Sequence, residues 1–188
     1  EPSPSAAEHA SWRLPELASP RDYAPTDPSA EAPSVVWVRS TDLRLHDNPA
    51  LHAASRSGTA VVAVFVLPAV HEQGGWPVCG AAAYWLHHSI NNLAHSLKRL
   101  GSALVLARAG DGGSAGALLG IVAECGAERL LYNAAYAPWE MAIEEEVESS
   151  FSSFGLGVER FPGNVLYEPS VARPDERSHH HGFGRVGF

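Results

Sequence analysis

Val35-Val36-Trp37-Val38-Arg39 and Ala60–Leu67 (AVVAVFVL) are two apolar runs of strand length, and a helix signal lies between them. The signal is Asn48-Pro49, because an Asn side chain can accept a hydrogen bond from a free helix amide and Pro has no amide to satisfy. We expect this helix to end near Ser57. Both runs are apolar throughout, which is typical of parallel strands covered on both faces. This stretch therefore predicts a strand–helix–strand unit of a parallel sheet.

The alternation of helices and strands continues along the chain. The clearest helix is predicted at 80–101, where apolar residues recur every three or four positions and share one face (Leu86, Ile90, Leu93, Leu97 and Leu100). The remaining elements are expected as strand 103–107, helix 115–125, strand 129–133, helix 138–154 and strand 157–161. Strands that alternate with helices predict an α/β fold, here a Rossmann-like five-stranded parallel sheet with helices on both faces.

Three regions are expected along the chain. Residues 1–33, rich in Pro, Ser and Ala, hold too little apolar surface to offset the entropy of ordering and are interpreted as a disordered leader. Residues 34–169 form the predicted α/β domain, and 170–188 an irregular tail. The three histidines at 179–181 are interpreted as solvated tail residues, since a metal site needs converging ligands and a second shell. The chain begins at Glu1, without Met, from which we expect a processed chain or a fragment.

Composition limits the function classes. The formal net charge is −8 and no segment is strongly basic, so direct nucleic-acid binding through phosphates is not expected. No apolar run approaches the ~20 residues of a membrane span, so no membrane partner is expected. Cys79 and Cys125 are too few for a disulfide framework or a cysteine zinc site. They are typical of free thiols in a reducing compartment, such as the nucleus, cytoplasm or plastid.

The candidate site follows from the expected sheet. In an open parallel sheet, ligands bind at the carboxyl ends of the strands, where the strand order reverses. The residues that follow three of the strands are therefore site candidates: Arg39, Asp42 and Arg44; Phe65 and Leu67; Asn133 and Tyr136. No phosphate-binding glycine motif and no nucleophile elbow is present, so no catalytic residue is predicted. The run Glu144-Glu145-Glu146 is interpreted as a solvated helix face. The residues alone support a small ligand-binding α/β domain.

Four motifs, in order, resemble the DNA photolyase/cryptochrome family. They are VVWVRSTDLRLHDNPAL at 35–51, the helix and turn from Trp85 to Ser102, YNAAYAP at 132–138, and VLYEP at 165–169. The resemblance covers residues 34–169, and it is closer to plant-type cryptochromes and related photolyases than to the DASH branch. The chain departs from the family pattern in having both Ser40 and Thr41 where the family has one residue. It also has Ala82-Ala83 where the family has Ser-Arg. Residues 171–188 do not continue into the family's long helical domain.

The resemblance implies an antenna role. In the family, the helical domain holds FAD, the electron-transfer tryptophans and the DNA-binding surface, so this chain alone is not expected to act as a photolyase. The family's α/β domain can hold a light-harvesting chromophore of the methenyltetrahydrofolate or 8-hydroxydeazaflavin type. By this resemblance the site candidates would contact the dye: Phe65 and Leu67 as an apolar wall, Asn133 and Tyr136 as polar contacts, and Arg39, Asp42 and Arg44 at the first loop. Phe65 as a core residue and Asn133 as a turn cap are equally compatible with the sequence.

Two other functions remain open. The chain is alternatively a non-catalytic interaction or regulatory module that binds no chromophore and pairs with an FAD-binding helical domain or a full-length relative. A third hypothesis is a nucleotide-binding domain of the broader Rossmann-like group, although no phosphate loop is visible in the sequence.

Overall fold

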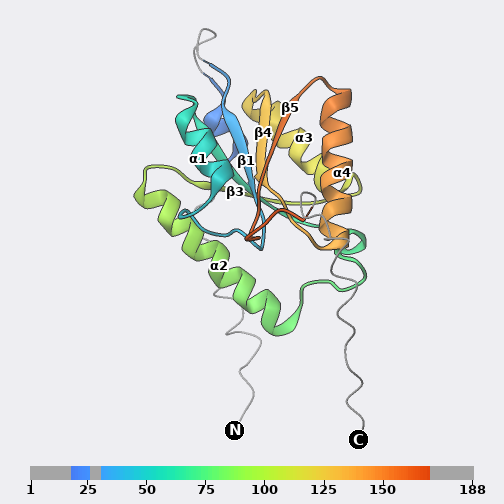
Figure 1. The fold of residues 1–188 in the computed structure, drawn as a ribbon. Coiled ribbons are helices and arrows are strands. Elements are labelled where there is room, and N and C mark those ends of the chain that lie inside the picture. The colour runs from blue at the N-terminus through green and yellow to red at the C-terminus, as the bar shows by residue number, and fades with distance from the viewer. Residues whose placement is uncertain (1–17, 26–30, 170–188) are drawn as a thin grey trace, which may run out of the picture.

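A computed structural model describes residues 18–25 and 31–169 (Figure 1). The predictions for residues 1–17, 26–30 and 170–188 lie outside this described part. The strands are β1 (Ser34–Val38), β2 (Val61–Leu67), β3 (Leu104–Arg108), β4 (Arg129–Asn133) and β5 (Gly157–Phe161). The helices are α1 (Pro49–Arg56), α2 (Gly80–Arg99), α3 (Gly113–Cys125) and α4 (Pro138–Ser153), with short 3-10 helices η2 (Pro20–Tyr23) and η3 (Val70–Gln73).

The five strands form one parallel sheet in the order β3-β2-β1-β4-β5. The order reverses between β1 and β4, because the chain first builds outward from β1 to β3 and then returns to the other side. Trp37 on β1 lies beside Val64 on β2 and Tyr132 on β4. The predicted Rossmann-like sheet is confirmed, and its switch point lies between β1 and β4.

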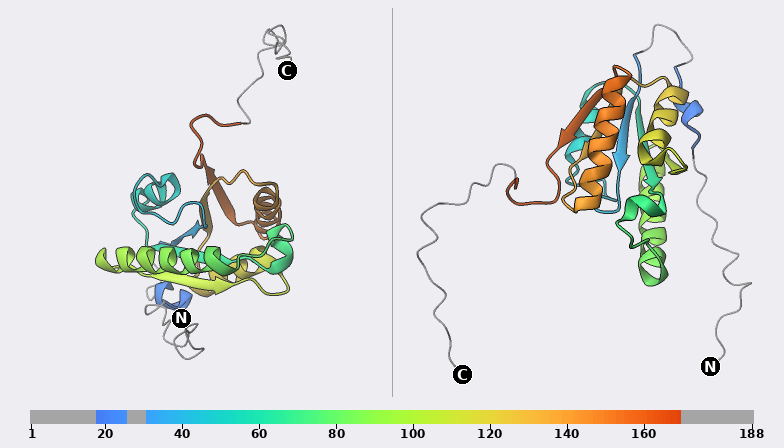
Figure 2. Two further views of the ribbon diagram at one scale, coloured as in Figure 1. Left: turned by 90° about the horizontal axis from the view of Figure 1, so that it is seen from below. Right: turned by 90° about the vertical axis from the view of Figure 1, so that its right-hand side faces the viewer.

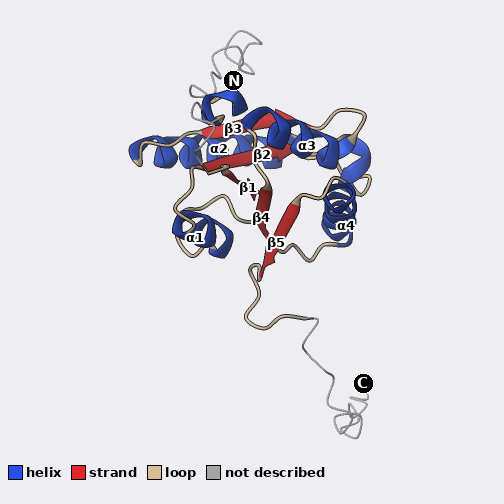
Figure 3. Cartoon of the chain, turned by 90° about the horizontal axis from the view of Figure 1, so that it is seen from above, coloured by secondary structure: helices blue, strands red, loops and turns tan. Residues whose placement is uncertain are grey.

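Helices cover both faces of this sheet (Figure 3). Alternate side chains of the central strands enter two separate cores, as the two-residue period of a strand requires. The core on the α3 and α4 side includes Val35, Trp37, Val64, Leu118, Tyr132 and Phe151. The core on the α1 and α2 side includes Val36, Val38, Phe65, Leu93 and Leu131. None of the helices within 18–25 and 31–169 has the length and apolar composition needed to cross a membrane.

Helix α2 is long and only partly packed. Its second half buries Ile90, Leu93 and Leu97 against the sheet. Its first half extends beyond the carboxyl ends of the strands, where Tyr84 and Trp85 are exposed (Figures 1 and 2). The start of α4 lies at this same end of the fold (Figure 1). The strand ends, the first half of α2 and the start of α4 therefore lie at the same end of the sheet.

The interpretation of residues 1–33 as a single disordered leader is wrong for residues 18–25. There the chain forms η2 and packs beside α3 and the edge strand β3. The Tyr23 hydroxyl donates to the carbonyl of Ala103 (3.1 Å) and accepts from its amide (3.2 Å), and the Ala18 amide donates to the carbonyl of Leu104 (3.3 Å). The low apolar content of residues 1–33 as a whole did not predict this attachment. It depends on one aromatic residue, Tyr23, which satisfies backbone groups at the sheet edge.

Replacing Tyr23 tests this attachment. We expect Tyr23→Phe to lower the free energy of unfolding by about 1 kcal/mol, because the change leaves the Ala103 backbone groups without their partner. Tyr167→Phe is the control, since the Tyr167 side chain is exposed, and it should leave stability unchanged. Urea unfolding of both variants measures the difference, and equal midpoints for Tyr23→Phe and the unmodified chain would contradict the attachment.

Candidate functional site

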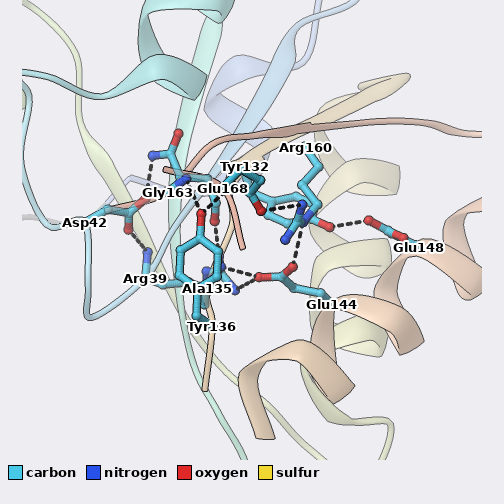
Figure 4. A network of polar contacts seen from close by, with 11 residues as sticks. Arg39, Asp42, Tyr132, Ala135, Tyr136, Glu144, Glu148, Arg160, Gly163 and Glu168 are labelled. Atoms are coloured by element: carbon cyan, nitrogen blue, oxygen red, sulfur yellow. Dashed lines mark hydrogen bonds and ion pairs between the residues drawn. The ribbon is translucent and has the colours of Figure 1, made fainter. Parts of the chain in front are cut away.

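A buried ion pair occupies the switch point between β1 and β4 (Figure 4). Arg39, directly after β1, is 6% exposed, and Glu144 of α4 is 5% exposed. Arg39 Nη1 donates to Glu144 Oε1 at 2.6 Å, and Nη2 donates to the carbonyl of Asn133 at the end of β4. Glu144 also accepts from the Ala135 amide (2.6 Å) and from Arg160 Nε (3.0 Å). The interpretation of Glu144 as part of a solvated face is therefore wrong.

The Asn133 side chain links the end of β4 to the loop after β1 and to the start of α1. Its Nδ2 donates to Asp42 Oδ2 (2.7 Å) and to Asn48 Oδ1 (2.8 Å), and its Oδ1 accepts from the Ala50 amide (2.9 Å) at the start of α1. Asp42 Oδ1 in turn accepts from the Arg39 amide (2.6 Å). Burial raises the pKa of Asp42, while these hydrogen bonds and the Arg39 charge oppose the increase. The hydrogen-bonding groups of the Asn133 side chain are thus all used within the chain.

Arg44 and Tyr136 hold the segment after β5 over the same region. Arg44 Nη2 donates to Asn164 Oδ1 at 2.6 Å. The Tyr136 hydroxyl donates to Glu168 Oε2 (2.8 Å) and accepts from the Gly163 amide (3.0 Å) (Figure 4). A Cβ at Gly163 would collide with the carbonyl of Ala134, so the two backbones approach as closely as a glycine allows. The switch-point crevice is therefore filled by side chains and crossed by the chain itself.

An open pocket lies to one side, at the carboxyl ends of β1 and β2. It has a volume of about 340 Å³, within the range typical of small-molecule sites. We call it the aromatic pocket. Its wall is formed by Trp37, Phe65, Leu67, Trp76, Leu86, Trp139 and Ile143, with Arg39, Glu72, Gln73 and Glu140 among its polar residues. The sheet, η3, α2 and α4 all contribute, so the pocket exists only in the folded domain.

The polar groups of the aromatic pocket differ in how they are satisfied. Glu72 accepts from the amide (2.7 Å) and hydroxyl (3.1 Å) of Ser114 and from the Ala69 amide (2.7 Å), so its carboxylate caps α3. Trp37 Nε1 and Arg39 Nε are buried donors that have no hydrogen-bond partner within the described residues. Burial raises the pKa of Glu140 above its ordinary value of 4.5, although the Arg39 charge opposes this.

This arrangement suits binding better than bond-making chemistry. Several aromatic rings can pack against a planar ligand, and a few polar groups can fix its orientation. The unused donors of Trp37 and Arg39 fit a ligand that carries acceptors on a flat ring system. Folate and deazaflavin rings both meet that description, so the residues present are compatible with either.

The predicted site residues divide into two groups. Arg39, Phe65 and Leu67 line the aromatic pocket. Asp42, Arg44, Asn133 and Tyr136 do not, and they brace the switch point and the segment after β5 instead. Sequence reasoning missed Trp76, Gln73, Trp139 and Glu140, which also line the pocket. Trp76 could have been found from its sequence context, GGWP at 74–77, because a large aromatic residue in a Gly- and Pro-rich turn is unusual.

The nucleotide-binding hypothesis finds no support in this geometry. In a Rossmann-type site, a phosphate lies at a helix N-terminus beside a glycine-rich turn. Here the Gly-rich turn leads into α3, and the Glu72 carboxylate already accepts from the Ser114 amide at that helix start. A Cβ at Gly113 would lie 2.9 Å from Glu72 Oε1, which shows how closely the carboxylate approaches. A phosphate would meet a negative charge at this position.

The parallel sheet, with helices on both faces and a pocket at its strand ends, defines a Rossmann-like α/β domain. A family model described as DNA photolyase matches residues 34–185. The chain therefore belongs to the DNA photolyase family, as its motifs predicted. It is 39% identical over 139 residues to a deoxyribodipyrimidine photo-lyase of Agrobacterium fabrum, covering 74% of this chain and 27% of that protein. It is 37% identical over 136 residues to cryptochrome-1 of Arabidopsis thaliana, covering 72% of this chain and 19% of that protein.

A solved structure supports the same assignment. The crystal structure of a bacterial class III photolyase from Agrobacterium tumefaciens aligns with a TM-score of 0.69 and 37% sequence identity, covering 80% of this chain and 30% of that one. The chain thus spans 19% to 30% of the length of these relatives.

The buried ion pair is testable with neighbouring glutamates. We expect Glu144→Gln to lower the free energy of unfolding by about 3 kcal/mol or more, because it leaves the buried Arg39 charge without its counter-ion. The matched control is Glu145→Gln on the same helix, where the side chain is exposed and the effect should be close to zero. Denaturant unfolding measures both, and similar losses in the two variants would contradict a special role for Glu144.

Glu140 should make stability depend on pH. Its raised pKa means that the folded state binds more protons than the unfolded state above about pH 4.5, so its contribution to the free energy of unfolding falls as the pH rises through that window. Glu140→Gln removes this contribution. We therefore expect the variant to gain stability over the unmodified chain as the pH rises from 4 to 7. Urea unfolding at several pH values measures the gain, and a constant difference would contradict it.

Proposed function

We propose that this chain is the antenna domain of a light-driven flavoprotein of the photolyase/cryptochrome group. It binds a light-harvesting chromophore of the folate or deazaflavin type in the aromatic pocket. The observation that carries the proposal is the pocket itself, an opening of about 340 Å³ whose walls hold three tryptophans and one phenylalanine. The names of the relatives, a photolyase and a cryptochrome, support a role in light-driven chemistry.

An antenna needs a different kind of site from an enzyme. It passes excitation through space, so the protein has only to hold the dye rigidly and exclude water from it. Buried groups on two sides give the pocket that rigidity. Arg39 is hydrogen-bonded to Glu144, and Glu72 is hydrogen-bonded to the start of α3. Trp76, which is 86% exposed, lies at the mouth of the pocket, where it can fold over a bound ring.

The partner in this proposal is an FAD-binding helical domain, which accepts the excitation. DNA repair or signalling would belong to the complete assembly rather than to this chain. Neither the bound dye nor the helical domain needs an acid, base or nucleophile from the residues around the aromatic pocket. We accordingly assign these residues a binding role and no catalytic step.

Absorption and fluorescence spectra of the purified chain test the proposal. The spectra are recorded alone, with 5,10-methenyltetrahydrofolate, and with an 8-hydroxydeazaflavin. Binding of either dye with altered emission supports the antenna role. Unchanged spectra with both dyes would reject it and favour an interaction module that binds no chromophore.

Two exposed tryptophans provide a matched pair for the same measurement. We expect Trp76→Ala to weaken dye binding about tenfold, because a ring that packs against the dye is lost. Trp85→Ala is the control, since Trp85 is 69% exposed on α2 and does not line the aromatic pocket. Titration followed by dye fluorescence gives both dissociation constants. An equal effect of the two substitutions would place the dye outside the aromatic pocket.

A further inference from the structure

The edge strand β3 is covered over only half of its length. It lies at one end of the strand order, with β2 on its inner side. Leu104 and Val105, the first two residues of β3, are buried, whereas Leu106 and Ala107 are partly exposed and Arg108 is exposed. The second half of this edge is therefore the part that another strand could cover.

Backbone groups of β3 point outward at every second residue. The carbonyl of Leu104 accepts from the Ala18 amide (3.3 Å), on the side away from β2. Because successive residues of a strand direct their amides and carbonyls to opposite sides, Leu106 and Arg108 also face outward. No backbone group within 18–25 or 31–169 bonds to these two residues on that side. The second half of β3 thus presents the pattern of groups that an added strand needs.

The N-terminal segment reaches this edge in the antiparallel sense. The Tyr23 hydroxyl hydrogen-bonds to the backbone of Ala103, and Ala18, five residues earlier in the chain, bonds to Leu104. Going backward along the N-terminal segment therefore goes forward along β3. The residues that precede Ala18 lead toward the second half of the edge.

The length of chain before Ala18 is sufficient to cover that half. The six residues that precede it are WRLPEL at 12–17, which lie outside the described residues. Six residues of extended chain span about 20 Å, whereas the four steps along β3 from Leu104 to Arg108 span about 13 Å. One continuous strand can therefore reach the end of β3.

The position of Pro15 fits the same register. Because the Ala18 amide is directed at β3, an extended chain directs the amides of Glu16 and Leu14 at β3 and positions 15 and 17 away from it. A proline has no amide and is tolerated in a strand where that group would face away from the partner. Pro15 stands at such a position, so the pairing loses no hydrogen bond there.

The apolar residues of the segment suit an edge that lies between two helix layers. In an extended chain, Trp12 and Leu14 share one face and Leu17 lies on the other. On the α2 side of the sheet, a mostly apolar pocket of about 390 Å³ opens beside Leu106. On the α3 side, Leu119 is only partly buried. Both faces of an added strand would therefore meet apolar surface.

We propose that residues 12–17 add to β3 as a sixth strand, antiparallel to it, with Glu16 opposite Leu106 and Leu14 opposite Arg108. The added strand closes an edge that would otherwise offer unpaired backbone groups to another chain. This proposal is independent of the antenna function, because it involves neither the aromatic pocket nor a chromophore. It also replaces the prediction of a disordered leader for these six residues.

Backbone amide exchange, followed residue by residue by NMR on the full chain, tests the proposal. Glu16→Pro removes an amide that faces β3 and prevents the pairing, so the Leu106 amide should exchange about tenfold faster. Glu16→Ala keeps that amide and is the matched control, which should leave the exchange of Leu106 unchanged. The Val105 amide faces β2 and should keep its protection in both variants.

Two shortened chains locate the strand. Removal of residues 1–11 should leave the exchange of Leu106 and Arg108 unchanged, whereas removal of residues 1–17 should make both about tenfold faster. Circular dichroism and the melting temperature show that the shortened chains are folded.

Three results would overturn the proposal. If Leu106 and Arg108 exchanged as fast in the full chain as in the chain without residues 1–17, the edge would be open and the leader disordered, as composition predicts. If their protection survived removal of residues 1–17 and rose with protein concentration, with a dimer in sedimentation, the edge would pair with a second copy of the chain. If removal of residues 1–11 alone abolished the protection, a more distant segment would cover the edge. None of these results bears on dye binding, which is measured separately.

Discussion

The buried pair of Arg39 and Glu144 is the interaction on which the architecture of the strand ends depends. It joins positions 105 residues apart and lies where the strand order reverses. Burying two charges costs several kcal/mol per ion, so the pair persists only because other hydrogen bonds complete it. Asn133, Ala135 and Arg160 supply those bonds. The result is a rigid centre that fixes the ends of β1, β4 and α4 relative to one another.

That centre decides where a ligand can bind. In many α/β proteins the switch point is an open crevice, whereas here it is filled by charged side chains and crossed by the segment after β5. The open volume lies instead beside it, between the ends of β1 and β2 and the helices α2 and α4. The Glu72 carboxylate accepts from the Ser114 amide at the start of α3, the helix that follows the Gly-rich turn. The open pocket of this domain is mostly apolar.

Helix α2 borders the aromatic pocket through Leu86. Helix α2 packs tightly through its second half and stands away from the strand ends through its first half, which leaves room beneath it (Figure 1). Aromatic side chains from β1, β2, α4 and the segment after η3 gather in this pocket. All of its walls come from the α/β domain.

The sequence by itself determined the elements of this fold and the family. The apolar runs at β1 and β2, the Asn48-Pro49 helix start and the spacing of the leucines in α2 are local patterns, and each element formed where its pattern placed it. Arg39, Phe65 and Leu67, which the sequence placed at the strand ends, line the aromatic pocket, and their contact with a ligand stays a prediction. The predictions of the helices and strands succeeded because periodicity and capping depend on residues close together in the chain.

Only the tertiary structure decided which polar residues remain available to a ligand. Asn133 and Tyr136 have the side chains expected of a binding site, yet partners 27 to 91 residues away in the chain use their polar groups. The Glu144 side chain is buried, whereas its neighbour in the same acidic run, Glu145, is exposed. A single helix position therefore separates the two environments. Trp76 reaches the aromatic pocket from the segment after η3, and Trp139 reaches it from the start of α4. Pairing and burial of this kind depend on strand order and helix placement, which no local pattern encodes.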